Sequence, residues 1–262
     1  MNHFQASRAI GYYLTSGHKR GHGIHSPFIF NTVTGVIQNK TAPEIVNKVE
    51  KIRSELKKDK RVIQLSDLGA GSLKGKNNFR RISDIVRYSS VSRKYGALLS
   101  RFASSVNGRP IIELGTSLGI STLYLARGAP GSVVHTVEGC KNLSEIAGET
   151  FSRANTKNVR QYQGSFDEQL AKLIPKISGP GLIFIDGDHR KESLLRYHSV
   201  LLGNAGKDTI IIIDDIHLTP GMESGWKEIK NSSEVSVSID LLRMGILFFI
   251  ENIAKQDITI RY

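Results

Sequence analysis

From Pro110 onward, short β-rich runs alternate with helical stretches, and this alternation constrains the fold more than any other feature of the sequence. It is typical of a parallel, doubly wound sheet. The stretch 235–251 then adds two strands with a tight turn near Arg243 to Gly245, which makes the final pair antiparallel. We therefore predict an α/β fold with a mainly parallel seven-stranded sheet and an antiparallel last strand. The five earlier strands are predicted at residues 111–114, 133–138, 159–164, 182–186 and 209–214.

The first 108 residues lack this alternation and carry the whole positive charge of the chain. They hold 19 Lys and Arg against 6 Asp and Glu, a net charge of +13, whereas residues 109–262 hold 17 against 18, a net charge of −1. Helical spacing predicts helices over residues 27–37 and 42–58 and a further helix ending near Val106. The apolar face of the second helix comprises Ile45, Val49, Ile52 and Leu56. We predict two domains, a basic and mainly helical N-terminal cap at 1–108 and an α/β domain at 109–262.

The charge of the cap fits several partners. A basic segment can serve an anionic small molecule, nucleic acid or an anionic membrane surface, or it can simply be solvated. The single cysteine, Cys140, excludes an internal disulfide and fits a reducing compartment. No apolar run approaches the ~20 residues of a membrane helix, and the N-terminus lacks the apolar stretch of a signal peptide. We expect a cytoplasmic protein, and a homodimer is left open.

A glycine-rich turn follows the first strand of the α/β domain. In IIELGTSLGIST, Gly115 and Gly119 separate a buried strand from a predicted helix, so the backbone can approach a ligand and the helix N-terminus offers N–H groups. Glu138 ends the next strand, where an acid accepts hydrogen bonds from ribose hydroxyls in Rossmann-like units. A surface acid at a strand end is the simpler alternative. The spacing Gly-x-x-x-Gly suits the amino acid end of S-adenosylmethionine better than the pyrophosphate of a dinucleotide.

Several motifs in order resemble one family across residues 109 to about 251. ELGTSLGIST, VVHTVE, QGSF and FIDGDH resemble the glycine-rich turn, the ribose-binding strand, the adenine-side loop and the fourth-strand motif of class I methyltransferases. The closest branch is that of the catechol O-methyltransferase-like small-molecule O-methyltransferases. This resemblance implies a Rossmann-like fold and S-adenosylmethionine as the cofactor. It assigns cofactor contacts to Glu113, Gly115, Ser117, Gly119, Ser121, Glu138, Gly164, Ser165, Phe166 and Asp186.

Three carboxylates end neighbouring strands of the predicted sheet. Asp186 follows one strand, and Asp214 with Asp215 follows the next, so we expect them to converge at one sheet edge. Like charges so close need a compensating cation, and three oxygen ligands suit Mg²⁺. The metal-dependent relatives have Asp-Asn where this chain has Asp214-Asp215. In the alternative without a metal, Asp215 caps a helix and Asp186 contacts the cofactor.

His189 is the candidate catalytic base, with Asp186 beside it. It stands where the metal-dependent members of the resembled branch place a lysine that helps to deprotonate the acceptor. Histidine can take a proton near neutral pH. A structural histidine at a helix start is the competing interpretation.

Two stretches of the cap invite other interpretations. DLGAGS at 67–72 looks like a second nucleotide-binding turn, but no second strand ending in an acid follows it, so we interpret it as a loop. The basic residues after it form a candidate wall for an anionic acceptor. They are Lys74, Lys76, Arg80 and Arg81. His18, His22 and His25 lie among glycines without an acidic or thiol partner, so we expect a lid that touches substrate or cofactor rather than a zinc site.

Taken together, the motifs predict an S-adenosylmethionine-dependent methyltransferase that acts on an oxygen of a small, anionic acceptor. An RNA methyltransferase is the first alternative: the basic cap favours it, but the cap has few interleaved aromatic residues and no recognisable RNA-binding module. The second is a non-catalytic methyltransferase-like protein that binds nucleic acid or membrane, which an intact cofactor turn argues against. The identity of the acceptor and the choice between O- and N-methylation do not follow from the sequence.

Overall fold

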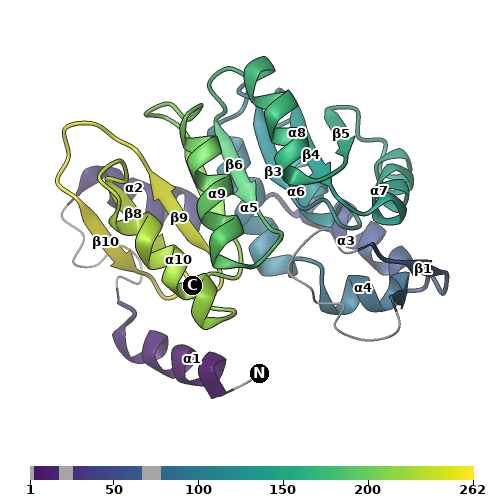
Figure 1. Cartoon of the computed structure of the whole chain (residues 1–262), viewed down its shortest axis with the longest axis horizontal. Helices are drawn as coiled ribbons and strands as arrows, with labels where there is room; N and C mark the ends of the chain where they lie inside the picture. Colours follow the sequence, from purple (N-terminus) through teal and green to yellow (C-terminus); the bar gives the residue numbers. More distant parts are fainter. Residues whose placement is uncertain (1–2, 18–25, 67–77) are drawn as a thin grey trace. The chain divides into compact units, whose positions relative to one another are not determined.

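The structure is a computed structural model that describes residues 3–17, 26–66 and 78–262 (Figure 1). The chain divides into two compact units, one formed by Lys40–Ser178 and the other by Met1–Asn39 together with Gly179–Tyr262. The limits of these units differ from the predicted domain boundary after residue 108. The division into a cap and an α/β domain stays a prediction.

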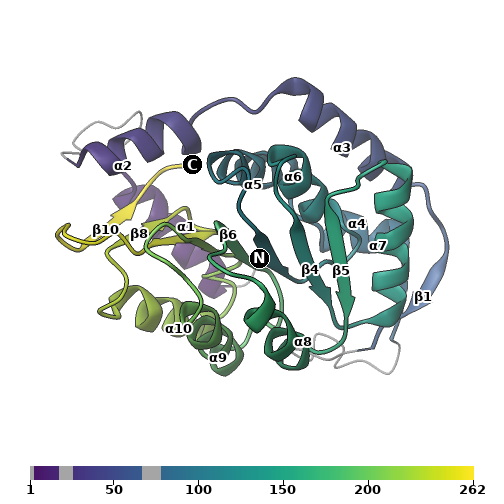
Figure 2. The same ribbon diagram turned by 90° about the horizontal axis from the view of Figure 1, so that it is seen from above.

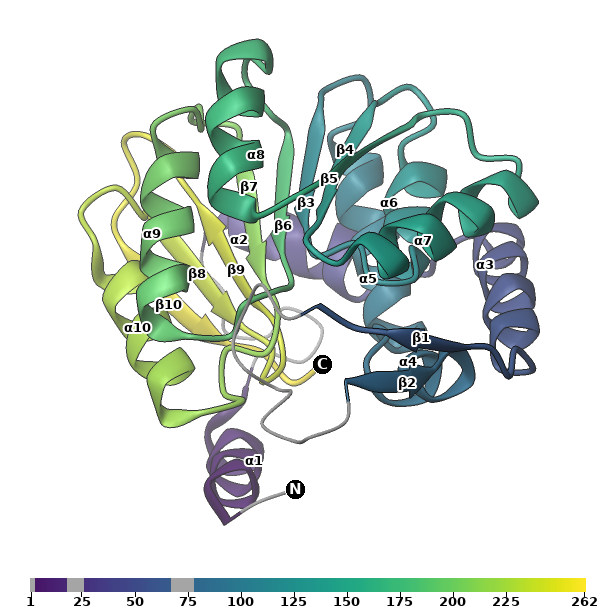
Figure 3. The same cartoon turned by 45° about the vertical axis from the view of Figure 1, so that its right-hand side comes forward.

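The unit of residues 40–178 contains a parallel sheet in the order β3-β4-β5 and a separate antiparallel pair, β1-β2. Helices α6 and α7 pack on β4, α8 packs on β4 from the side opposite to α6 (Figure 2), and β2 lies beside α4 (Figure 3). The elements in chain order are α3 (Pro43–Leu56), β1 (Val62–Gln64), β2 (Phe79–Arg81), α4 (Ile82–Tyr88), α5 (Arg93–Ser105), β3 (Ile111–Leu114), α6 (Ile120–Gly128), β4 (Val134–Glu138), α7 (Lys141–Arg153), β5 (Val159–Gln163), α8 (Phe166–Leu173) and a 3₁₀ turn (Ile174–Lys176).

Helices α5 and α6 approach each other closely because glycine occupies two contact positions. A Cβ on Gly96 of α5 would lie 2.4 Å from the ring of Tyr124, and one on Gly128 of α6 would lie 2.2 Å from the backbone oxygen of Ser100. Gly96, Tyr124 and Ser100 are all buried. The close packing of these two helices therefore requires glycine, which has no Cβ, at both positions.

The other unit holds five strands in the order β6-β7-β9-β8-β10. Strands β6 and β7 are parallel, β9 is antiparallel to both of its neighbours, and β10 runs parallel to β8. Helices α9 and α10 pack together over one face of these strands, and α2 lies over the other face, where Phe28 meets Phe248 (Figure 2). The elements in chain order are α1 (His3–Thr15), α2 (Pro27–Thr32), a π-helical turn (Val33–Ile37), β6 (Leu182–Ile185), α9 (Lys191–Leu202), β7 (Ile210–Ile213), α10 (Pro220–Asn231), β8 (Val237–Asp240), β9 (Gly245–Phe248) and β10 (Gln256–Thr259).

Most of the predicted architecture is confirmed, and two details are wrong. All seven predicted strands are present, the sheet is mostly parallel, and β8 and β9 are antiparallel as expected. The described residues after 109 contain an eighth strand, β10, which the sequence analysis missed. The antiparallel strand is consequently β9 and not the last strand. The predicted helix ending near Val106 is present as α5, and a further short helix, α4, precedes it.

Local sequence signals explain where several helices begin. Ser92, Ser165 and Thr219 precede α5, α8 and α10, and each side-chain oxygen accepts a hydrogen bond from a backbone N–H in the first turn. Pro220 follows at a position where its missing N–H costs nothing. None of the helices in the described ranges combines the length and the apolar character needed to cross a bilayer.

His198 on α9 makes stability dependent on pH. It is 6% exposed, and burial lowers its pKa from 6.5 to about 4, opposed by Glu234. Because the unfolded chain takes up the proton first, the stabilisation is complete above pH 6.5 and is lost as the pH falls towards 4. Over this pH interval, we expect the free energy of unfolding to fall by about 3 kcal/mol more in wild type than in His198→Gln. Urea unfolding at each pH measures this difference. Parallel stability curves for the two proteins would contradict this prediction.

Candidate active site

The glycine-rich turn predicted from the sequence lies between β3 and α6. Gly115 has φ 104°, Ser117 has φ 49° and Gly119 has φ 84°, so three of five residues are left-handed. A Cβ on Gly119 would lie 2.6 Å from the ring of Phe151, which makes glycine necessary there for space as well as conformation. Gly119 is also the N-terminal cap of α6. The turn thus presents backbone close to the first N–H groups of a helix, as an anionic or polar ligand requires.

Glu138 ties this turn to the end of β4. One carboxylate oxygen accepts a hydrogen bond from the Ser117 N–H at 2.7 Å, and the other accepts one from the Cys140 N–H at 2.9 Å. The residue is 8% exposed, and burial raises its pKa, although the backbone N–H donors oppose the rise. The alternative of a surface acid at a strand end is therefore wrong. Each carboxylate oxygen has two lone pairs, so these bonds leave acceptor capacity for ribose hydroxyls.

Glu113 lies inside the unit, beneath the turn. Its carboxylate accepts hydrogen bonds from the hydroxyls of Thr122 and Thr136 at 2.5 and 2.6 Å, and the side chain is fully buried. Burial raises the pKa of Glu113 to about 7, partly offset by hydrogen bonds from Thr122, Thr136 and Ser121. Glu113 and Ser121, both predicted cofactor contacts, thus interact with each other in the interior and fix α6 to β3 and β4.

The predicted adenine-side loop begins where β5 ends. The Gly164 N–H donates to the Glu138 carbonyl at 3.0 Å, and Gly164 has φ 141°. Ser165 caps α8 by accepting from the Glu168 N–H, and half-buried Phe166 is the first residue of that helix. Parallel pairing of β3, β4 and β5 therefore gathers the predicted cofactor residues 113–121, 138 and 164–166 at one edge of this sheet.

The strand-end acids predicted in the other unit also come together. His189 Nε2 lies 3.9 Å from Asp186 Oδ1 and 4.0 Å from Asp215 Oδ2, and all three side chains are partly exposed. Burial raises the pKa of Asp215, and the charge of Asp214 adds to this effect. Asp188, in contrast, is a structural residue, because its carboxylate binds Arg190 at 2.5 and 2.7 Å. The side chains of Asp186 and Asp215, two of the predicted acids, thus lie close to His189, the predicted catalytic base.

Arg243 is the functional candidate that the sequence analysis missed. Its Nε lies 2.9 and 3.2 Å from the two oxygens of Asp214, and its Nη2 lies 2.8 Å from Oδ2. The same Nε is 3.4 Å from Asp215 Oδ1. Asp214 has no exposed surface, so the guanidinium is its charge partner. Two features of the sequence could have indicated this residue. Three neighbouring carboxylates require a compensating positive charge, and the turn between β8 and β9 contains a single basic residue.

The predicted magnesium ligands do not fit a metal ion. Both oxygens of Asp214 bind Arg243, whereas Mg²⁺ needs oxygen ligands at ~2.1 Å with octahedral geometry. Within residues 3–17, 26–66 and 78–262, the structure contains no group of three or more His, Cys, Asp or Glu side chains that could hold a metal ion. The assignment of Asp186, Asp214 and Asp215 as a metal set is therefore corrected, because the charge that they need is supplied by an arginine.

The candidate acceptor wall and the histidine stretch are described only in part. Arg80 and Arg81 lie on β2 and are exposed. The other residues fall outside the described residues, together with DLGAGS at 67–72; they are Lys74, Lys76, His18, His22 and His25. Their proposed roles stay predictions.

A comparison with protein families identifies the part of the chain that carries these features. Residues 112–216 match the family model described as a methyltransferase domain. This range contains the glycine-rich turn, Glu138, and the acids that follow β6 and β7. Residues 112–216 are therefore similar to the methyltransferase domain family, which confirms the predicted resemblance to class I methyltransferases.

The relatives found among curated proteins are O-methyltransferases. A catechol O-methyltransferase from Mycobacterium tuberculosis is 33% identical over 129 residues, which cover 48% of this chain and 56% of the relative. Another from Niastella koreensis is 31% identical over 131 residues, which cover 48% and 58%. The match thus spans little more than half the length of these relatives. They do not favour the alternatives of an RNA methyltransferase or a non-catalytic binding protein.

Solved structures share the fold over a larger part of the chain. The O-methyltransferase from Bacillus cereus, in complex with S-adenosylhomocysteine, has a TM-score of 0.54 and 20% identity, covering 84% of this chain and 97% of that one. An O-methyltransferase of tomaymycin synthesis from Streptomyces achromogenes, in complex with S-adenosylmethionine, has a TM-score of 0.57 and 18% identity, covering 83% and 95%. At these identities the likeness establishes the Rossmann-like methyltransferase fold.

Proposed function

We propose that this chain transfers the methyl group of S-adenosylmethionine to an oxygen of a small molecule. The observation that carries the proposal is the bond between Glu138 and the backbone of Ser117, which places an acid acceptor directly at a left-handed glycine-rich turn. The family of residues 112–216 supports the same assignment. The names of the relatives favour a phenolic hydroxyl as the acceptor group.

The proposed roles divide between two groups of residues. When bound, S-adenosylmethionine supplies a methyl group on a sulfonium, and transfer is an in-line displacement that requires alignment above all. The turn from Gly115 to Gly119 holds the amino acid end, Glu138 accepts from the ribose hydroxyls, and residues 164–166 border the adenine. Asp186 orients the acceptor hydroxyl, and His189 takes its proton. This assignment includes no magnesium ion.

The function is tested by two measurements on the intact chain. Calorimetry should detect stoichiometric binding of S-adenosylhomocysteine, and isotope-labelled S-adenosylmethionine should transfer its methyl group to at least one member of a panel of phenols and catechols. Absence of binding would rule out the cofactor assignment. Binding without transfer to any hydroxyl would instead favour a non-catalytic role.

Replacing His189 should impair the chemical step specifically. A general base contributes about 10²- to 10⁴-fold, so we expect kcat of His189→Gln to fall at least 100-fold while the affinity for S-adenosylhomocysteine changes less than about threefold. His198→Gln is the matched control, because it makes the same change in the same unit at a residue without a catalytic assignment, and it should keep its kcat at pH 8. Equal rates for His189→Gln and wild type would remove His189 from the mechanism.

Three further predictions belong to the proposal. An anionic acceptor would be attracted by Arg80 and Arg81, which are exposed on β2, and replacing both by Gln should raise its KM at low salt. A cytoplasmic location and a homodimer are predicted alongside it. Fractionation and analytical ultracentrifugation test these two.

A further inference from the structure

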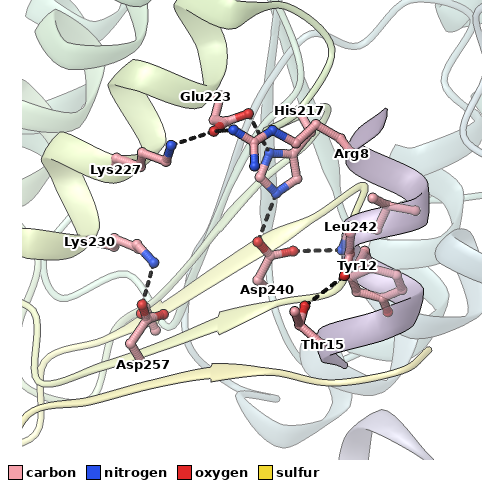
Figure 4. Close-up of polar contacts among 12 residues, drawn as sticks. Arg8, Tyr12, Thr15, His217, Glu223, Lys227, Lys230, Asp240, Leu242 and Asp257 are labelled. Carbon is pink, nitrogen blue, oxygen red and sulfur yellow. Dashed lines mark hydrogen bonds and ion pairs between the residues drawn. The ribbon is translucent and has the colours of Figure 1, made fainter. Parts of the chain in front are cut away.

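The turn that carries Arg243 is firmly held. Leu242 is left-handed, with φ 71°, and its N–H donates to Asp240 Oδ1 at 2.7 Å. The other oxygen of Asp240 lies 2.8 Å from His217 Nε2, so one carboxylate joins this turn to the segment after β7 (Figure 4). A backbone bond from the Ile216 N–H to the Arg243 carbonyl, at 3.1 Å, ties the same two segments together. The position of Arg243 is therefore built into the fold and does not rest on a flexible side chain alone.

The guanidinium also matches its carboxylate partners in charge and shape. Arg243 presents Nε and Nη2 to the two oxygens of Asp214, which is the side-on, two-bond geometry of a strong arginine–carboxylate pair. Burial alone would lower the pKa of Arg243, but the bonds and charges of Asp214, together with Asp215 and Asp186, raise it above its ordinary value. The arginine thus stays charged and compensates a group of three acids.

We propose that Arg243 occupies the place of the divalent cation in this active site, so that methyl transfer by this chain is independent of metal. The part that concerns catalysis rests on the proposed function, whereas the part that concerns cation binding does not. A divalent ion would meet the positive guanidinium and would find Asp214 already bound on both oxygens. Asp186 and Asp215 alone are a weak site for Mg²⁺, which favours near-complete octahedral coordination.

The substitution also bears on the acceptor. A metal ion with open coordination positions can hold two neighbouring oxygens of a substrate. A guanidinium that binds Asp214 through Nε and Nη2 can use its remaining N–H groups only as hydrogen-bond donors, so it does not coordinate two substrate oxygens as a metal ion does. The acceptor is then held by hydrogen bonds and needs a single hydroxyl, so a simple phenol should be methylated as readily as the corresponding catechol.

The wild-type protein provides the first test. Mn²⁺ serves as the probe for a divalent site, because its electron paramagnetic resonance signal distinguishes free from bound ion. We expect no binding below 1 mM, a threshold on the order of weak adventitious sites, and unchanged methyl transfer after exhaustive chelation. Stoichiometric Mn²⁺ binding at micromolar concentration, or activity lost to a chelator and restored by Mg²⁺, would overturn the proposal.

Two variants test the role of Arg243 itself. Arg243→Met removes the charge but keeps an unbranched side chain, so it should free Asp214 and create Mn²⁺ binding that wild type lacks. The double variant Asp214→Asn/Arg243→Met leaves no buried unpaired carboxylate at this position, and it should fold without binding Mn²⁺. A folded Arg243→Met protein that fails to bind Mn²⁺ would contradict the assignment. If that variant does not fold, wild type and Arg243→Lys decide the question. We expect both proteins to contain no bound metal and to keep their methyl transfer after chelation.

Failure of this inference and failure of the proposed function can be told apart. The Mn²⁺ measurements need no catalytic activity. A chain that binds no S-adenosylhomocysteine but gains Mn²⁺ on loss of Arg243 would refute the methyltransferase and keep the arginine assignment. A methyltransferase whose activity is lost on chelation would support the proposed function and refute the assignment of Arg243.

Discussion

Replacing Glu138 by Gln should weaken the binding of S-adenosylhomocysteine by about 100-fold. Hydrogen bonds to a charged group contribute roughly 1.5 to 3 kcal/mol each. The amide of Gln has only one acceptor oxygen, and that oxygen carries no charge. The change is measured by calorimetry at fixed ionic strength. Because the Glu138 carboxylate also accepts from the backbone N–H groups of Ser117 and Cys140, a fall in affinity alone would not separate ribose binding from damage to the turn.

A ligand lacking the ribose hydroxyls makes that separation. The 2′,3′-dideoxy analogue of S-adenosylhomocysteine should bind wild type far more weakly than the parent compound does, whereas Glu138→Gln should distinguish the two much less. If Glu138 only shapes the turn, both proteins will lose the same factor on removal of the hydroxyls. That result would withdraw the ribose assignment and leave Glu138 a structural residue.

Gly128→Ala should destabilise the protein by about 3 kcal/mol, the upper part of the range for overpacking. Its Cβ would lie 2.2 Å from the backbone oxygen of Ser100, which cannot rotate away, so α5 and α6 must separate. For a chain of this size the loss corresponds to a fall in Tm of about 6 to 12 °C. Scanning calorimetry or urea unfolding measures it.

Gly148→Ala is the matched control for this prediction. Gly148 lies within α7 of the same unit, and the nearest atom to an added Cβ is a side-chain oxygen of Gln161 at 3.8 Å. Alanine there should raise stability by about 0.5 to 1 kcal/mol, because it restricts the unfolded chain. Equal effects at both positions would mean that the close approach of α5 and α6 carries no special cost.

The sequence predicted best those features that are encoded within a few residues of each other. The glycine-rich turn, the acid at the end of β4 and the hairpin of β8 and β9 are local patterns, and all are present. The approach of the strand-end acids Asp186 and Asp215 to one place, where both lie near His189, could also be predicted, since parallel neighbouring strands end at one edge.

Features that depend on distant partners were missed. Arg243 pairs with Asp214 across 29 residues, and the turn that aims it is set by the contacts of Asp240 with His217 and Leu242. Strand β10 is short, half-buried and polar in part, so it lacks the apolar run that identified the other strands. The buried bonds of Glu113 to Thr122 and Thr136 likewise follow only from the fold.

Ile260, directly after strand β10, also determines when α1 can complete its packing. The Tyr12 hydroxyl donates to the carbonyl of Ile260, and Gly17 forms a parallel bridge with the same residue. The middle unit, residues 40–178, has its sheet and helices complete while synthesis continues, but α1 meets its first partners only at Leu218 and Glu223, and Tyr12 waits for Ile260. We therefore expect α1 to stay exposed on the ribosome longer than the elements of the middle unit. Removing residues 256–262 should therefore release α1 to proteases while the middle unit stays resistant.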